Sequence, residues 1–403
     1  MGNQITRLAL PFQVYALTGS TLAIGALTTV QLVPILAFAL AAGSLADAVD
    51  RRKLLLITQV GLMLCSVAFV VLAMQDDPPL PGLFAVAFVA AGLSAVDQPA
   101  RSSAIPRLVP PERLASAITL NQLNNRAASI VGPAVAGVLI ATVGLVGAYV
   151  VDVLSFTATF IGVLALRPLP PLGQVGRPGL AAIREGLAFV RGRRAILGTF
   201  VIDLDAMVLA MPTALFPAIA LDVFRVGPAG LGLLASAPAV GAFLAALFSG
   251  WVGRVVRIGR AVIGCVLVWG LAMAAFGAAT VAQEFTPLPS LAIFAVALVM
   301  LGIAGAADMG SAVLRSTIVQ LSAPDQLRGR VIGIHTLVVT SGPRFGDIQS
   351  SIVAAVIGPG QAVVLGRLTC VAGVGVIVRL IPELAAHVVV RGRAIDQPPP
   401  VPD

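Results

Sequence analysis

Apolar residues gather along this chain in stretches as long as a membrane-spanning helix, and short polar or Pro/Gly-containing breaks separate them. A helix needs roughly 20 apolar residues to cross the hydrocarbon core of a bilayer. Twelve such stretches can be drawn, so the pattern predicts twelve transmembrane helices. The expected spans are 2–17, 22–46, 53–74, 80–98, 115–141, 145–166, 196–220, 229–252, 259–281, 289–312, 328–357 and 361–382.

The longest break, 167–194, leaves six stretches before it and six after it. Within it Leu180, Ile183, Leu187 and Val190 recur at helical spacing among arginines, which predicts an amphipathic helix at the membrane surface. The Pro-rich end of the chain, from Ala394, is expected to be disordered. The predicted parts are a six-helix bundle over 1–166, a cytoplasmic linker over 167–194, a second six-helix bundle over 195–383 and a cytoplasmic tail over 384–403.

The second half repeats the first at an offset of 206 to 214 residues. Each copy holds six helices, an even number, so both copies share one orientation and are related by an axis along the membrane normal. The matching segments are Pro11 to Gly25 with Pro217 to Gly232, Gly43 with Gly250, Arg101 to Leu114 with Arg315 to Leu327, and Gly132-Pro133 with Gly342-Pro343.

The same repeat makes the first helix look short. If Pro11 corresponds to Pro217, Met1 corresponds to about Met207, whereas the first helix of the second half is expected to begin near Ala195. We therefore expect that about a dozen residues are missing from this helix, through a start codon assigned too late or a truncated form.

Composition agrees with a membrane protein and excludes other classes. The chain is 58% apolar and 11% charged, with a mean hydropathy of +1.00, whereas about a quarter of a soluble domain is charged. A soluble core cannot use this much apolar surface, and a disordered chain has the opposite balance.

The formal charge of +8 is explained by where the basic residues lie. Alternate breaks between the predicted helices, counted with the first three residues of the span that follows, and the end of the chain hold 20 of the 26 lysines and arginines. The other breaks hold only Arg225. By the positive-inside rule both termini face the cytoplasm. With 5% aromatic residues and no Lys-rich tract, the basic charge does not indicate nucleic acid.

Residues with catalytic or metal-binding chemistry are scarce. Cys65, Cys265 and Cys370 each stand alone in an apolar stretch, and His335 and His387 are too few for an ordinary zinc centre. No Gly-rich phosphate loop or Ser/His/Asp constellation is recognisable. We expect neither an enzyme nor a bound metal or cofactor.

Local motifs resemble those of the major facilitator superfamily of transporters. The segment GSLADAVDRRK matches the family's loop between its second and third helices at Gly43, Leu45, Asp47, Arg51 and Arg52, but departs from it at Ala48 and Asp50. GPAVAG, Gly132 to Gly137, is similar to the Gly-Pro motif of antiporters, and Phe88 occupies the place of the family's helix 4 arginine. ALPFQVYALTGS, DQPARSSAIPRLVP and SGPRFGDIQ resemble the subgroup of the enterobactin exporter and related macrolide and drug efflux proteins, the transmembrane secretion effectors.

The resemblance implies a cytoplasmic gate at the loop motif. A carboxylate there can accept hydrogen bonds from the N-H groups that open a neighbouring helix. By resemblance Gly43, Asp47, Arg51 and Arg52 form this latch, and the alternative is a solvated loop that only sets topology. The motifs at Gly132, Pro133, Gly137, Gly342 and Pro343 predict hinges or gate-sealing surfaces, with close packing without motion as the alternative.

Acidic residues at membrane depth are candidates for proton coupling, because a charge in lipid is costly without water or a partner. Asp203 and Asp205 lie about 12 to 15 Å into their helix and, being two residues apart, cannot both face one cavity. They are our first choice. Further candidates are Asp152, which could equally be a structural anchor, and Asp347, which could pair with Arg344 three residues earlier. His335 is titratable near neutral pH and is a candidate too, although a lone histidine on a helix is more often a packing residue.

Two polar stripes are expected to line a translocation cavity. One lies on the first helix and the other on the fifth, and neither pattern suits a helix surrounded by lipid. Their residues are Asn3, Gln4 and Arg7, and Asn121, Gln122, Asn124, Asn125 and Arg126. Arg344 in the second half is a further candidate for lining the cavity.

These observations predict an all-α membrane protein of the bacterial cytoplasmic membrane with the major facilitator fold. We expect a monomer that exports a small amphiphilic molecule, siderophore-like or drug-like, by alternating access against an inward proton flux. The partners are this substrate, protons and the lipid bilayer. The alternatives are a membrane scaffold or sensor that does not transport, and an importer of a small solute.

Overall fold

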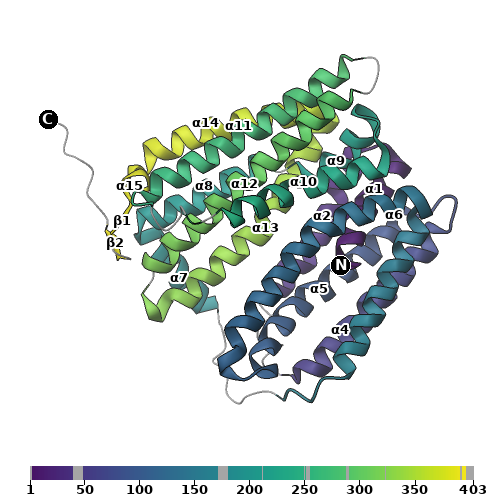
Figure 1. Ribbon diagram of the computed structural model, residues 1–403, viewed down its shortest axis with the longest axis horizontal. Coiled ribbons are helices and arrows are strands. Elements are labelled where there is room, and N and C mark those ends of the chain that lie inside the picture. Colours follow the sequence, from purple (N-terminus) through teal and green to yellow (C-terminus); the bar gives the residue numbers. More distant parts are fainter. Residues whose placement is uncertain are drawn as a thin grey trace. The chain divides into compact units, whose positions relative to one another are not determined.

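The computed structural model describes residues 2–39, 49–170, 180–210, 212–248, 250, 255–286, 290–322, 324–390 and 393–395. Long helices account for almost all of these residues (Figure 1). A short antiparallel hairpin, β1 (Val388–Val390) and β2 (Arg393–Ile395), follows the last helix. Ala394 and Ile395 therefore pair in a strand, while the rest of the expected disordered tail lies outside the described residues.

The chain separates into two compact units, Met1–Pro178 with Val226–Ser236, and Gly179–Arg225 with Ala237–Asp403. In unit 1, α4 packs against α5 and α6, α2 against α5, and α1 against α6 (Figure 1). Its helices are α1 (Gly2–Thr18), α2 (Thr21–Ala39), α4 (Arg51–Ala73), α5 (Leu80–Leu108), the 3-10 turn η1 (Pro111–Arg113) and α6 (Leu114–Leu164).

Unit 2 has the same plan of packed helices. Here α11 lies between α12 and α14, and α8 packs against α13 and α14 (Figure 1). The elements are α7 (Leu180–Gly192), α8 (Arg194–Ala210), η2 (Thr213–Leu215), α9 (Phe216–Ala218), η3 (Ile219–Val223), α11 (Ile258–Glu284), α12 (Leu291–Ser322), α13 (Asp325–Ile357), α14 (Pro359–Leu380) and α15 (Pro382–Ala386). Helix α10 (Gly227–Leu247) contributes its first turns to unit 1 and its remainder to unit 2.

Within the described residues, nine helices are long and apolar enough to cross a membrane by length and composition. One of them, Pro111–Leu164, covers the predicted span 115–141 and all but the last two residues of the span 145–166. Gly144 separates these two inside α6 with φ 72° and ψ −179°, a backbone conformation that only glycine adopts readily. Each predicted span overlaps a described helix. The shortest helices that match a span are α1 and α8, with 17 residues each.

Two helices run further than the sequence predicted. Helix α5 continues through Pro99 and Pro106 to Leu108, not to 98, and α12 continues to Ser322, not to 312. The prediction took polar residues and prolines as the end of the helix. Because side chains such as Arg101 and Arg315 find partners inside their bundles, both helices extend past the apolar stretch, and these arginines lie on helices and not in loops.

The amphipathic helix α7 is seated on unit 2. Val190 is 2% exposed and belongs to an apolar cluster with Ile196, Phe200, Val319 and Val331. Contacts of α7 with α8 and α13 hold it there. The part of the apolar face that Val190 occupies is thus covered by protein.

The segment that follows the last helix of each half caps the third helix of that half. In unit 1 the backbone N-H of Arg51, which opens α4, donates to the carbonyl of Leu169 at 3.2 Å. In unit 2 the N-H of Gly259, near the start of α11, donates to the carbonyl of His387 at 3.2 Å. The repeat seen in the sequence therefore extends to equivalent backbone contacts.

Candidate functional site

A buried ion pair between two helices forms the centre of unit 2. Asp203 Oδ1 on α8 lies 2.8 Å from Arg315 Nη2 on α12, and the two side chains are 1% and 3% exposed. His335 Nε2 on α13 lies 3.8 Å from the second carboxylate oxygen of Asp203. Three helices thus bring one acid, one permanent cation and one titratable imidazole together inside unit 2.

Neighbouring side chains hold the arginine and the histidine in place. Arg315 Nη1 donates to Ser311 Oγ at 2.8 Å, and Arg315 Nη2 lies 4.0 Å from Asp308 Oδ1, both on its own helix. The ring of Phe200 meets the His335 ring edge-on, with 5.6 Å between centroids. Because a buried charge must be paired to be tolerated, this set reads as one connected ionic site. Cys265 of α11 is within electrostatic range of Arg315.

Asp205 faces away from this site, as two positions on a helix require. Its Oδ2 accepts a hydrogen bond from Cys370 Sγ at 3.3 Å, and its Oδ1 lies beside Gly373 of α14. Arg367 of the same helix donates from Nη1 to the carbonyl of Leu209 at 3.0 Å. Unit 2 therefore holds the two acids of α8 in separate environments.

Asp347 binds the turn that follows α8. Its Oδ1 accepts hydrogen bonds from Thr213 Oγ1 at 2.6 Å and from the backbone N-H of Ala214 at 2.9 Å. Arg344 is within electrostatic range of this carboxylate, in line with the expected pair on one face of the helix. The contacts of Asp347 make it a structural cap for η2 in this conformation.

In unit 1 Asp152 is a fully buried acid that accepts hydrogen bonds from hydroxyl groups on two other helices. Thr6 Oγ1 on α1 and Ser66 Oγ on α4 donate to Asp152 Oδ2 at 2.5 and 2.7 Å. One turn earlier, the hydroxyl of Tyr149 donates to Gln13 Oε1 at 2.8 Å. These bonds join α1, α4 and the second half of α6.

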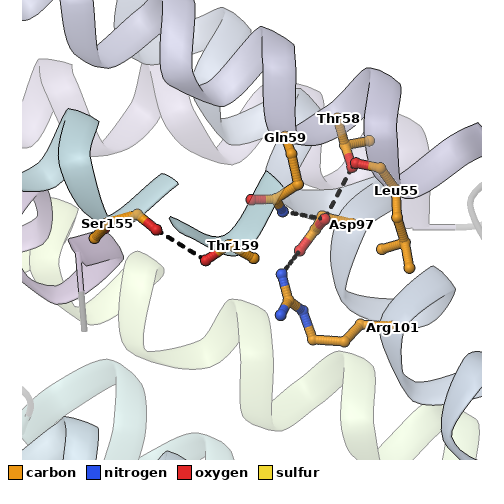
Figure 2. A network of polar contacts seen from close by, with 7 residues as sticks. All are labelled: Leu55, Thr58, Gln59, Asp97, Arg101, Ser155 and Thr159. Carbon is orange, nitrogen blue, oxygen red and sulfur yellow. Dashed lines mark hydrogen bonds and ion pairs between the residues drawn. The ribbon is translucent and has the colours of Figure 1, made fainter. Parts of the chain in front are cut away.

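A second acid in unit 1, Asp97, was not singled out from the sequence. Figure 2 shows it between α4 and α5. Its Oδ1 accepts from Thr58 Oγ1 at 2.9 Å and from Gln59 Nε2 at 2.8 Å, and its Oδ2 accepts from Arg101 Nη2 at 3.1 Å. The signal was present in the segment DQPARSS, but a helix ending at 98 placed Arg101 in a loop and left Asp97 without a partner.

The repeat relates this cluster to the ionic site of unit 2. Arg101 and Arg315 are equivalent at the repeat offset, and so are the positions four residues earlier, Asp97 and Ser311. In both units the arginine contacts the side chain four residues before it. In unit 2, where that residue is a serine, the carboxylate is supplied by Asp203.

The two polar stripes lie at different heights along α6. Gln4 of α1 packs against Gly132, where an added Cβ would lie 2.5 Å from the Gln4 Cβ. At a rise of 1.5 Å per residue, Asn121 lies about 16 Å before Gly132 along α6, and Arg126 lies about 9 Å before it. Gln122, Asn124, Asn125 and Arg126 are exposed, as are Asn3 and Arg7, while Asn121 and Gln4 are half-buried.

The gate motif contacts the end of α6. Asp50 caps α4: its Oδ1 accepts from the N-H of Arg52 at 2.9 Å and also from the N-H of Leu169 at 3.1 Å. Arg52 Nη2 donates to the carbonyl of Leu164 at 2.7 Å. Arg51 is 5% exposed. Gly43 and Asp47 lie outside the described residues.

The glycines of the Gly-Pro motifs lie at close contacts between helices. An added Cβ at Gly137 would lie 2.8 Å from the Cα of Gly232, within unit 1. At Gly342 it would lie 2.9 Å from Met207 Sδ, within unit 2. Both helices continue through Pro133 and Pro343. Within the described part of the chain, no group of three or more His, Cys, Asp or Glu residues could hold a metal ion.

Three comparisons place these features among known proteins. A family model described as transmembrane secretion effector matches residues 1–397. An enterobactin exporter of Citrobacter koseri is 27% identical over 98% of this chain and 90% of its own. The multidrug efflux pump Tap of Mycolicibacterium fortuitum is 30% identical over 85% of this chain and 83% of its own.

Solved structures share the fold at lower identity. A bacterial homologue of the iron transporter ferroportin, in an inward-facing state, has a TM-score of 0.70 at 16% identity and covers 96% of this chain and 95% of its own. The nucleoside transporter NupG has a TM-score of 0.73 at 12% identity, covering 94% and 95%. These likenesses confirm the fold that the motifs predicted.

Proposed function

Since the chain belongs to the transmembrane secretion effector family of the major facilitator superfamily, and is thus a membrane transporter and not an enzyme, we propose that it exports a small amphiphilic molecule from the cytoplasm by proton antiport. The relatives named above are exporters of a siderophore and of drugs. We propose a substrate of one of these two kinds. Both termini then face the cytoplasm, as the positive-inside rule requires.

The observation that carries the antiport proposal is the buried pair of Asp203 and Arg315. An antiporter needs a group that gains a proton in one conformation and loses it in the other. When a proton binds Asp203, the pair loses its attraction and leaves Arg315 with a weaker partner. His335, 3.8 Å away, offers a second acceptor for the same proton. Proton binding thereby changes which packing of α8, α12 and α13 is preferred.

Substrate and proton can then compete for one conformational change. In alternating access a ligand shifts the equilibrium only by its differential affinity for the two states. We propose that substrate binds one conformation and protonated Asp203 favours the other. Polar side chains of α1 and α6 are proposed to contact the substrate within the first six-helix bundle. They are Asn3, Arg7 and the stripe from Asn121 to Arg126.

The test is counter-transport in proteoliposomes with an imposed pH gradient, screened over siderophores and antibiotics. We expect substrate to move against the proton flux in the wild-type protein. Asp203→Asn should abolish proton-driven transport while substrate binding remains. Asp205→Asn is the matched control, because this acid lies on the same helix and faces α14. Full transport by the Asp203→Asn protein would exclude Asp203 as the coupling group.

The same assay separates the alternatives. An importer would accumulate substrate in the direction of the proton flux, and a scaffold or sensor would move none. Transport without any response to the pH gradient would retain the exporter and reject proton antiport.

A further inference from the structure

An apolar layer lies between the ionic site of unit 2 and the linker helix α7, and α7 contributes one residue to it. We call this layer the plug and define it as Val190, Ile196, Phe200, Val319 and Val331. Its members are at most 5% exposed, and they come from α7, α8, α12 and α13. Phe189, Leu197, Ile334 and Val338 pack around it.

Helical spacing places the plug directly against the charged residues. Phe200 precedes Asp203 by three residues on α8, and Val331 precedes His335 by four on α13. On α12, which runs in the opposite direction, Val319 follows Arg315 by four. Residues three or four apart share a helix face, so each charged side chain has a plug residue one turn nearer to α7. The ring contact between Phe200 and His335 joins the two layers.

Val190 of α7 completes this layer from outside the bundle. Helix α7 ends at Gly192 and α8 begins at Arg194, so α7 lies next to the end of α8 that leads to Asp203. Val190 is 2% exposed within the cluster, whereas Leu187, one turn earlier on α7, is 37% exposed. The linker helix therefore contributes one buried apolar side chain to the plug.

Polar contacts of the ionic site lead away from the plug. On α12, Ser311 and Asp308 lie one and two turns from Arg315 on the side opposite Val319, at 2.8 and 4.0 Å from its guanidinium. The Asp308 side chain is 58% exposed. The site thus has an exposed acid on one side and an apolar layer on the other.

We propose that the plug, closed by Val190 of the linker helix, blocks proton passage between Asp203 and the α7 side of the membrane, and that α7 must withdraw for the proton to be released there. This inference rests on the proposed function. A proton needs water or polar groups to move, and an apolar constriction excludes them. The linker between the two halves would thereby control the release step, which prevents a proton leak when no substrate is carried.

The test is proton leak without substrate. Proteoliposomes that contain a trapped pH dye receive an acid pulse, and the rate of internal acidification is measured. Val190→Ser should leak several-fold faster than wild type. Leu187→Ser, one turn away on the same face of α7 but 37% exposed and outside the plug, is the control and should remain as tight as wild type. Val190→Thr keeps the shape of valine and adds a hydroxyl group, so it decides the question if Val190→Ser protein does not run as a single species in detergent.

A second variant ties the leak to the ionic site. Combining Val190→Ser with Asp203→Asn should return the leak to the wild-type rate, because the proton loses its binding group. If both Val190 variants leaked protons no faster than wild type, the proposal that the plug blocks proton passage would be wrong. A leak that persists in the double variant would show that protons bypass Asp203, and would overturn the assignment of the plug to this site. The proposed antiport is judged separately, by substrate transport in Asp203→Asn alone.

Discussion

Arg315 Nη2 lies 2.8 Å from Asp203 Oδ1, and both side chains are almost completely buried. The equivalent arginine of the first half, Arg101, lies 3.1 Å from Asp97 on its own helix, and its side chain is 44% exposed. The two halves thus keep the same arginine, but in the second half a different helix supplies the carboxylate. Ser311 now stands where the first half has Asp97.

This relationship predicts the effect of moving the acid. Asp203→Ser should destabilise the protein by about 3 to 5 kcal/mol, because it leaves a buried arginine without its ionic partner. Adding Ser311→Asp should restore much of the loss, since position 311 already contacts Arg315. Proton-driven transport should stay low, because Asp203 on α8 contacts both Arg315 and His335, whereas Ser311 lies on α12 and contacts Arg315.

Thermal unfolding in detergent and counter-transport measure the two effects of this relocation. The single variant Ser311→Ala serves as the control for loss of the serine alone. If the relocated acid restored full transport, the position of the acid would not matter, and the pairing with Arg315 would be sufficient.

Asp152 is expected to act as a structural anchor that needs oxygen acceptors more than charge. Asp152→Asn retains an acceptor for Thr6 and Ser66 and should unfold near the wild-type temperature. Asp152→Leu should lower the free energy of unfolding by about 1 to 3 kcal/mol, because it leaves buried hydroxyl groups without this acceptor. Thermal unfolding of both proteins in detergent provides the measurement. A folded Asp152→Asn protein without proton-driven transport would instead make Asp152 the coupling acid.

Asp50 is expected to tie the gate motif to the segment that leaves α6. Asp50→Ala should cost about 0.5 to 2 kcal/mol, the usual loss of a helix N-cap. Amide hydrogen exchange of Arg52 and Leu169 should accelerate together, because one carboxylate oxygen accepts from both N-H groups. Asp50→Asn keeps an acceptor and should protect both amides. Faster exchange at Arg52 alone would mean that the contact with Leu169 is not held in solution.

Gly373 and Asp205 should behave as a coupled pair. A Cβ at position 373 would lie 2.1 Å from Asp205 Oδ1, so the Asp205 side chain would have to leave its present position beside α14. Gly373→Ala should therefore destabilise by about 1 to 3 kcal/mol, as overpacking does. Asp205→Ala should suppress that loss in the double variant. Additive losses in the double-mutant cycle, measured by thermal unfolding, would contradict direct contact between the two residues.

The helix ends show where prediction from the sequence stopped. The pattern placed a helix in each apolar stretch but ended α5 at 98 and α12 at 312, although they run to Leu108 and Ser322. Hydropathy records what a side chain prefers on average and not which partner it finds. The pattern therefore gives Asp97 no role and places Arg101 and Arg315 in loops, and only their contacts in the structure identify them.

The divergence of Asp203 and Asp205 was predictable, because residues two apart on a helix cannot share a face. Their partners were not. Arg315 and Cys370 are each more than a hundred residues away along the chain from the acid that they contact. The spacing of residues along one helix does not predict contacts with such distant residues. The same holds for Val190, whose helical spacing predicted an apolar face but not that unit 2 would cover it.

By itself the sequence determined the solvent, the number of apolar stretches, the repeat and the family motifs, since these follow from local composition and from spacing along one helix. The tertiary structure decided which charged groups meet, which acid is buried beside an arginine and which apolar face is sealed by protein. Those outcomes depend on packing between helices far apart in the chain, where a shift of one turn would exchange one partner for another.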